Sequence, residues 1–435
     1  MPGNLAKIDL REAPRFFEKF YRRYSRHFKT KTRSVGNKAK NYMLGGLHLD
    51  RKATLTNMPK VISGADSQNL QHFITDSPWK NEPVITQLQK DADDLIGGED
   101  SALIVDGSAF SKQGEKSVGV KRQWCGRLGK VENCQVGVFL GLANSKGDRT
   151  LIDEQLYLPE EWAEDEERRK EAGVPEVVKF RKKPELALDM ILGAKENGVS
   201  FGWVNADSLY GRSSDFRGRL DEENITYVVD VPSDTNVRQV GEAASIEGEE
   251  EPSRRVDELA EGLDSSRMEK VYVRDTERGE LKSEAIALRV YTVEDEKPSD
   301  DEEWLVIRKD DNKDETKHLL SNESPDTSLE KLVKMSAARY WIERAIEDGK
   351  GEASMGDYEV RKWKGWHHHM TMVMLAMLLL LEMKLKLGEE TPALTVQDTR
   401  EILQFTLPRR DVTADDFLKL LREKIKRRKT ARASR

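Results

Sequence analysis

The order of short apolar runs in residues 101–231 most strongly limits what this chain can fold into. We predict strands over 102–106, 116–124, 133–143, 199–206 and 226–231, and helices over 184–197 and 215–223. Short apolar runs bounded by turn residues are typical of buried strands. Strands that alternate with helices in this way predict an α/β fold, with a mixed sheet and helices packed on it.

The segment before these strands has a helical pattern. Aromatic residues recur at helical spacing among Arg and Lys in residues 16–24, and two more helices are expected over 67–75 and 82–95. Gly97 and Gly98 end this segment.

Residues 232–326 change to an alternation of apolar and polar residues. The alternating runs are 270–274, 284–293, 303–308 and 317–321. Such runs are typical of half-buried strands. We therefore predict a β-rich insertion behind an acidic linker at 241–252.

Helical periodicity then returns. Thr327 and Glu330 form a capping-box pattern that predicts a helix running to about Gly349. A strongly apolar helix is expected over 366–387, and a basic helix at the C-terminal end.

Composition excludes several classes of protein. Of the 435 residues, 35% are charged, and the longest apolar stretch, Met370 to Met383, is too short to cross a bilayer. No apolar signal segment is seen at the N-terminus. The two cysteines cannot frame a disulfide scaffold, so a reducing cytoplasm is expected.

The net charge of −7 hides an uneven distribution. Residues 1–52 carry fourteen Lys and Arg against four acids, and residues 419–435 are basic again. The acids gather in 242–264 and 295–315. Basic ends of this kind predict contacts with phosphates. Solvated helix faces are the alternative interpretation.

Two acids have positions that indicate chemistry. Asp106 and Asp207 each close an apolar strand. A carboxylate at such a position is costly to desolvate unless it binds a positive group, and two of them close together attract divalent cations. The alternative is that each acid caps a turn or a helix.

A third acid, Glu343, shares a helix face with Arg339 and Lys350. Their spacing of i, i+4 and i+11 places all three on one side. This face offers a metal-binding carboxylate between two cations that can hold phosphate. Glu347 lies on the same face and is a rival metal ligand. A solvated helix with ion pairs is the alternative.

A series of motifs stands in order along the chain. They are Leu70-Gln71-His72-Phe73, Asp76-Ser77-Pro78-Trp79, Ile104-Val105-Asp106-Gly107, residues 117–123, Gly126-Arg127-Leu128-Gly129-Lys130, Asn133-Cys134-Gln135, residues 156–162, Asp207 with Tyr210-Gly211, and residues 339–345. In these motifs the chain resembles prokaryotic insertion-sequence transposases with a DDE triad, of the insertion-sequence-4 and insertion-sequence-701 groups. The resemblance covers most of residues 60–390.

The resemblance implies a ribonuclease-H-like core that a β-rich insertion interrupts before the catalytic Glu. Asp106, Asp207 and Glu343 fall on the three catalytic acids of the family, which also bind the metal. It further implies two Mg2+ ions, with Mn2+ as a substitute.

The related group also carries a Tyr-Arg-Glu-Lys signature. Arg339, Glu343 and Lys350 match its last three members and imply DNA contacts at the two cations. Ser336 occupies the Tyr position. Either Tyr340, one turn along, replaces the Tyr, or this phosphate contact is missing.

Three further residues are candidates for DNA binding. Relatives stack a flipped base on a Trp of the inserted domain, which implies Trp304, with a role in the core as the alternative. Lys121 and Arg122 lie near Asp106 in the sequence, and a plain strand role is equally open to them.

Two other features are set aside. His367, His368 and His369 are consecutive on a helix and point about 100° apart, so they cannot hold one ion together. Cys125 and Cys134 have no CxxC partner and are expected to be buried.

The first hypothesis is therefore a DDE transposase that cleaves its terminal inverted repeats and transfers the strands to target DNA, as a homodimer in the prokaryotic cytoplasm, at the nucleoid. A DNA-binding repressor without catalysis and a ribonuclease-H-like nuclease without joining activity are the alternatives. The expected domains are a helical N-terminal DNA-binding domain (1–98), the first part of the catalytic core (99–231), the β-rich insertion (232–326), the helical second part of the core (327–390) and a basic C-terminal helical tail (391–435).

Overall fold

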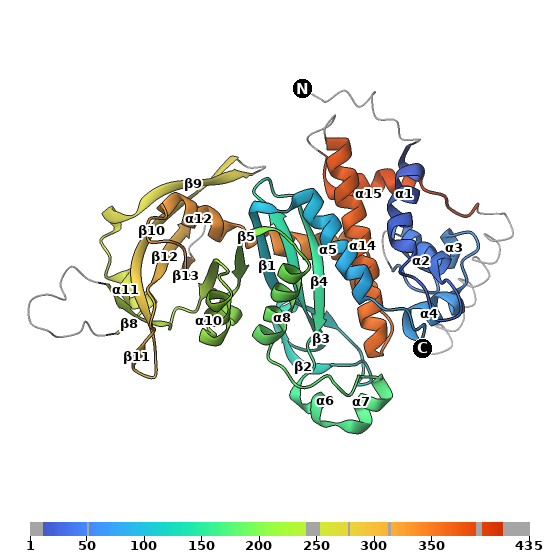
Figure 1. Ribbon diagram of the computed structural model, residues 1–435, viewed down its shortest axis with the longest axis horizontal. Helices are drawn as coiled ribbons and strands as arrows, with labels where there is room; N and C mark the ends of the chain where they lie inside the picture. The colour runs from blue at the N-terminus through green and yellow to red at the C-terminus, as the bar shows by residue number, and fades with distance from the viewer. Residues whose placement is uncertain are drawn as a thin grey trace, which may run out of the picture.

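The computed structural model describes residues 12–49, 52–240, 253–276, 279–311, 315–388 and 394–411. A single large sheet runs through the molecule, and a group of helices lies at one end of it (Figure 1). The predicted acidic linker at 241–252 and the basic segment at 419–435 lie outside the described residues.

The N-terminal segment is helical, as predicted. Its helices are α1 (Ala13–Ser25), α2 (Gly36–His48), α3 (Met58–Val61), α4 (Ser67–Thr75) and α5 (Glu82–Ile96). In α1, Phe17, Phe20 and Tyr24 recur every three or four residues and are buried, whereas Arg15 and Lys19 on the other face are exposed. This apolar stripe packs α1 onto the rest of the helical layer.

The sheet has thirteen strands in the described residues. They are β1 (Gly98–Ser111), β2 (Lys121–Cys125), β3 (Lys130–Asn144), β4 (Arg149–Leu156), β5 (Phe201–Ala206), β6 (Tyr227–Val231), β7 (Asn236–Gln239), β8 (Arg254–Arg255), β9 (Glu269–Thr276), β10 (Gly279–Glu294), β11 (Lys297–Pro298), β12 (Glu303–Asp310) and β13 (Thr316–Ser321). The main order is β2-β3-β1-β5-β6-β13-β12-β10-β7-β8, and β4, β9 and β11 pair at its edges. The central strands β1, β5 and β6 are parallel, which makes the sheet mixed.

The strands predicted for the insertion are present, and they continue the core sheet. β13 pairs with β6, and β12 and β10 follow it. The insertion therefore has a rigid connection to the strands that carry the acids.

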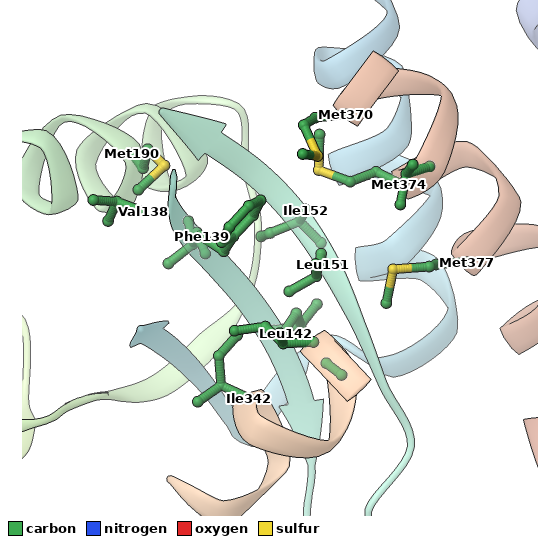
Figure 2. Packing of buried hydrophobic residues seen from close by; sticks show 14 of the residues in the cluster. Val138, Phe139, Leu142, Leu151, Ile152, Met190, Ile342, Met370, Met374 and Met377 are labelled. Atoms are coloured by element: carbon green, nitrogen blue, oxygen red, sulfur yellow. The ribbon is translucent and has the colours of Figure 1, made fainter. Parts of the chain in front are cut away.

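The remaining helices cover the two faces of the sheet and its insertion. They are α6 (Glu160–Glu164), α7 (Glu166–Ala172), α8 (Lys183–Glu196), α9 (Ser208–Gly211), α10 (Ser214–Glu222), α11 (Val256–Glu261), α12 (Leu329–Ala337), α13 (Tyr340–Glu352), α14 (Trp363–Gly388) and α15 (Val396–Thr406). Figure 2 shows Val138 and Met190 on one side of the core strands, and Met370, Met374 and Met377 of α14 on the other. The Met-rich helix is thus part of the core, as predicted.

The single helix predicted from Thr327 to Gly349 is wrong in two respects. The N-cap is Ser328, whose hydroxyl accepts from the Lys331 amide, and not Thr327. The helix is also divided into α12 and α13. The amide of Ala338 bonds to a carbonyl three residues back, and this tighter turn redirects the chain between the two helices.

The three consecutive histidines are packing residues, as predicted. His367 bonds to Glu154, His368 to two backbone carbonyls, and His369 to the Tyr42 hydroxyl. These contacts join α14 to the sheet and to the N-terminal helices. Both cysteines are buried.

The long helix α14 raises the question of a membrane segment. Among the described helices, none combines the length and the apolar character that crossing a bilayer requires.

Candidate active site

Asp106 and Asp207 lie side by side at the carboxyl ends of two parallel strands. β1 and β5 pair so that Val105 is opposite Ala206, and each acid is the next residue along the chain. The carboxyl ends of parallel strands meet at one edge of a sheet, where α/β proteins usually place their ligand sites. Two acids predicted from separate segments therefore share one location.

The local backbone holds both carboxylates. Asp106 accepts a hydrogen bond of 2.6 Å from the Gly107 amide. Asp207 caps α9, where it accepts a hydrogen bond of 2.9 Å from the Leu209 amide. Capping of α9 is one reason for an acid at position 207. A single hydrogen bond from a backbone amide leaves most of each carboxylate available for other partners.

The surroundings of Asp106 disfavour the charged form of its carboxyl group. Its pKa is raised from 3.8 to about 7, chiefly by burial and next by the negative charge of Asp207. Arg339 lowers this pKa, and Glu343 raises it. Asp106 is thus within electrostatic reach of the other two predicted acids.

Helix α13 brings the third acid to this group through an arginine. The Arg339 guanidinium donates to Glu343 at 2.7 Å and lies 3.1 Å from the carboxylate of Asp230. The Glu343 side chain is 48% exposed, so it can change partners. The rival acid Glu347 pairs with Arg344.

Lys350 reaches β1 from the end of α13. Its ammonium donates to the hydroxyl of Ser108 at 2.7 Å and lies 5.3 Å from the centre of the Phe110 ring. Ser108 is two residues after Asp106 and therefore points to the same face of β1. The structure thus brings Arg339 and Lys350 to the same sheet edge as the acids, on the helix face that the sequence predicted.

The residues present fit a divalent cation. Asp106 and Asp207 repel each other, and their oxygens are the hard ligands that Mg2+ prefers. The described residues contain no ready-made group of three His, Cys, Asp or Glu side chains around one metal position. In this structure Glu343 binds the guanidinium of Arg339.

The two candidates for the signature Tyr have different surroundings. Ser336 is buried, accepts from Arg308 at 2.6 Å and donates to the Val333 carbonyl. Tyr340 is 39% exposed, and the guanidinium of Arg274 lies 4.2 Å from the centre of its ring. Ser336 thus serves the packing of α12, and Tyr340 is the one with access to a ligand.

The other predicted DNA-binding residues lie away from the acids. Lys121 and Arg122 are on β2, where Lys121 pairs with Glu161 at 2.7 Å. Trp304 is on β12 and donates its indole N–H to the Ser324 carbonyl at 3.0 Å. Their roles in DNA binding stay predictions.

Three groups near the acids were given no role from the sequence. Asp230, inside β6, holds Arg339, and burial raises its pKa. Lys183 begins α8, and burial lowers its pKa, while the charge of Asp207 acts in the opposite direction. The Tyr210 hydroxyl is buried and has no hydrogen-bond partner in the described part of the chain. The one available sequence signal was Asp230 itself, a charged residue inside an apolar strand.

Comparison with known proteins identifies the family of the chain. Residues 23–279 match the family model of the DDE superfamily endonucleases, a range that includes Asp106 and Asp207 and ends before Glu343. The chain is 30% identical over 319 residues to the probable transposase for insertion sequence element IS701 of Microchaete diplosiphon, which covers 71% of this chain and 73% of that protein. The mixed sheet with its flanking helices is the ribonuclease-H-like fold that the resemblance implied. The chain therefore belongs to the DDE superfamily of endonucleases, and within it to the insertion-sequence transposases.

Proposed function

We propose that this transposase is a Mg2+-dependent enzyme that cleaves the ends of its own element and joins the freed 3′-hydroxyl to target DNA. The observation that carries the proposal is the electrostatic group of Asp106, Asp207 and Glu343 at one sheet edge, in a chain of this family. Cleavage adds water across a phosphodiester bond, and joining replaces the water by a DNA hydroxyl. Both reactions need the same charges to be neutralised, so one site serves both.

The side chains divide into metal ligands and phosphate contacts. Asp106 and Asp207 would hold the metal from the strand ends, and Glu343 would join them from α13 after leaving Arg339. Mg2+, with Mn2+ as a substitute, lowers the pKa of a bound water and stabilises charge on the leaving oxygen. Arg339 would then be available to the DNA phosphates beside Lys350.

DNA outside the site would be held by the basic N-terminal region. Arg15, Lys19 and Arg22 lie on the exposed face of α1, opposite its buried aromatic residues. Cations on one helix face can neutralise successive phosphates. We assign DNA binding to the domain over 1–98, and expect a homodimer that pairs two element ends at the prokaryotic nucleoid. The other domain boundaries remain as predicted from the sequence.

The test is cleavage and strand transfer of a duplex carrying the terminal repeat, with and without Mg2+. The variants are D106N, D207N and E343Q. E347Q is the matched control, because Glu347 lies on the same helix face but pairs with Arg344. Loss of both reactions in the first three, with activity kept in E347Q, supports the proposal. Normal cleavage by E343Q would remove Glu343 from the site.

The alternative functions make different predictions in the same assay. A repressor binds the repeat but gives no product with Mg2+. A nuclease without joining activity gives cleaved ends but no strand-transfer product.

A further inference from the structure

The hairpin formed by β2 and the start of β3, residues 121–134, presents an apolar surface to solvent. Trp124 is 64% exposed, Val131 52% and Leu128 43%. Trp124 and Val131 are paired directly across the two strands, so their side chains stand together on one face. The turn between the strands is closed by Gly129 at a positive φ of 59°. Within the part of the chain that the structure describes, this apolar group stays uncovered.

The exposed face is fixed by the buried one. Cys125 and Cys134 occupy the inner positions of the hairpin and are fully buried against Val136. Because strand side chains alternate between faces, Trp124 cannot turn inward without bringing these positions out. The register that buries the two cysteines therefore leaves the Trp124 indole exposed to solvent.

Hydrogen bonds from the neighbouring loop make the base of the hairpin rigid. The Asn133 side chain donates to the carbonyls of Lys112 and Gly114, both at 2.9 Å. The Gln123 side chain donates to the Cys134 carbonyl at 3.0 Å. A hairpin held at its base in this way loses less conformational entropy when it binds a partner.

The charge of the hairpin selects the partner. Residues 121–134 contain four cations, Lys121, Arg122, Arg127 and Lys130, against one acid, Glu132. Lys121 and Lys130 have carboxylate partners in the structure, whereas Arg122 is exposed on the same face as Trp124. A positively charged surface repels a second copy of itself and attracts phosphates. An exposed aromatic ring between cations is a usual means of stacking on bases or entering a groove.

The hairpin lies within a short distance of the acids along the sheet. Asp106 is paired with Phe139 and Trp124 with Val131, so the two positions are eight residues apart along β3. This separation is at most about 26 Å at the usual rise of a strand. It corresponds to about eight base-pair steps. Figure 1 shows β2 and β3 in the lower part of the central sheet, with α6 and α7 below them.

We propose that this hairpin is a DNA contact of the transposase, with Trp124 placed against the bases of the element's end within about eight base pairs of the cleaved bond. Arg122 holds the adjacent phosphate, and Leu128 and Val131 complete the apolar contact. The location of the DNA relative to Asp106 rests on the proposed function, but binding itself does not.

The experiment measures the affinity of the full-length protein for a duplex carrying the terminal repeat that flanks its own gene, in chelator, so that no cleavage is required. The variants are W124A and R122Q. F405A is the matched control, because Phe405 is another exposed aromatic residue, on α15. Thermal unfolding of each variant checks that it is folded.

W124A should bind about tenfold more weakly, with the salt dependence of the wild type, because a stacking contact releases no counterions. R122Q should reduce the salt slope by about one. F405A should bind as the wild type does. In a nuclease footprint of the repeat, W124A should lose protection at one place, within about eight base pairs of the cleaved bond.

Wild-type affinity and an unchanged footprint in W124A would overturn the proposal. So would a W124A protein that binds DNA normally but sediments as a smaller oligomer, since the surface would then join two copies of the chain. A wild type that binds the repeat but does not cleave it with Mg2+ would contradict the proposed function and leave the hairpin contact standing.

Discussion

Two carboxylates on the same sheet, Glu154 and Asp106, have opposite surroundings. Glu154, on β4, accepts from the Trp366 indole at 2.5 Å and bonds to His367 at 2.6 Å. Asp106, on β1, has the Gly107 amide as its hydrogen-bond donor and a second carboxylate beside it. Glu154 is satisfied within the protein, whereas the surroundings of Asp106 increase the free energy of its charged form.

This difference separates structural acids from reactive ones. Glu154 joins the sheet to α14, and its pairing with a histidine makes that junction stable. Although burial alone would lower the pKa of His367, the charge of Glu154 raises it. Among the described residues no ion pair satisfies Asp106, because Arg339 pairs with Asp230 and Glu343 instead. A cation supplied from outside is the group that would satisfy it.

The largest effect is expected from D106N. Cleavage should fall by at least about a thousandfold, or about 4 kcal/mol of transition-state stabilisation, because Asn cannot supply the charge. Single-turnover cleavage of the terminal-repeat duplex measures this loss. Unfolding without metal should be no easier than for the wild type, since the variant removes repulsion. Retained cleavage would make Asp106 a structural acid like Glu154.

The pH dependence of stability without metal sharpens the same contrast. The Asp106 pKa is about 7 in the folded protein, against 3.8 ordinarily, so the folded state binds the proton more tightly. Its contribution is therefore complete below pH 3.8 and is lost as the pH rises to about 7. D106N does not titrate there. Its unfolding free energy relative to the wild type should increase by on the order of 3 kcal/mol across that range, and a constant difference would contradict the surroundings described for Asp106.

E154Q should have the opposite signature. Removing the charge leaves a buried histidine without its carboxylate, which destabilises the fold by about 3 kcal/mol. Denaturant unfolding measures this effect. At a temperature where the variant is folded, its cleavage rate should equal that of the wild type. A large loss of cleavage there would show that the two acids are not functionally distinct.

D230N tests the role of Arg339, which pairs with both Asp230 and Glu343. Asp230 positions Arg339, so its loss should reduce cleavage by about 10- to 100-fold, as for other residues that orient a metal site. D348N is the matched control, because Asp348 pairs with Arg149 at 2.6 Å without contacting the acids. The concentration of Mn2+ that gives half-maximal protection against thermal unfolding should shift in D230N alone. Equal shifts in both variants would indicate a general effect on the fold.

Much of the fold could be predicted from local pattern. The apolar runs that end at Asp106 and Asp207 predicted strands β1 and β5, and the period of the helix that contains Glu343 placed it on one face with Arg339 and Lys350. Local chemistry determines such features. The sequence resemblance then supplied the roles, which neither periodicity nor spacing could establish.

The features that depend on tertiary packing were not predictable in this way. Strand β4, which carries Glu154, has no clear alternation, because its residues are covered on both faces. The proximity of Asp230 to Arg339 depends on the register between β5 and β6. The exposure of Trp124 depends on which hairpin face the cysteines occupy, and a strand pattern does not reveal that.

The central claim is that Asp106, Asp207 and Glu343 hold one metal site, and Fe2+-directed cleavage of the polypeptide tests it most directly. Fe2+ bound in place of Mg2+ reduces added hydrogen peroxide to hydroxide and a hydroxyl radical, and this radical cuts the chain close to the metal. If the three acids share one metal site, we expect cuts near the end of β1, at the start of α9 and in the first turn of α13. All three cuts should be lost in D106N. Cuts confined to other segments, or cuts near the aspartates with none in α13, would contradict it.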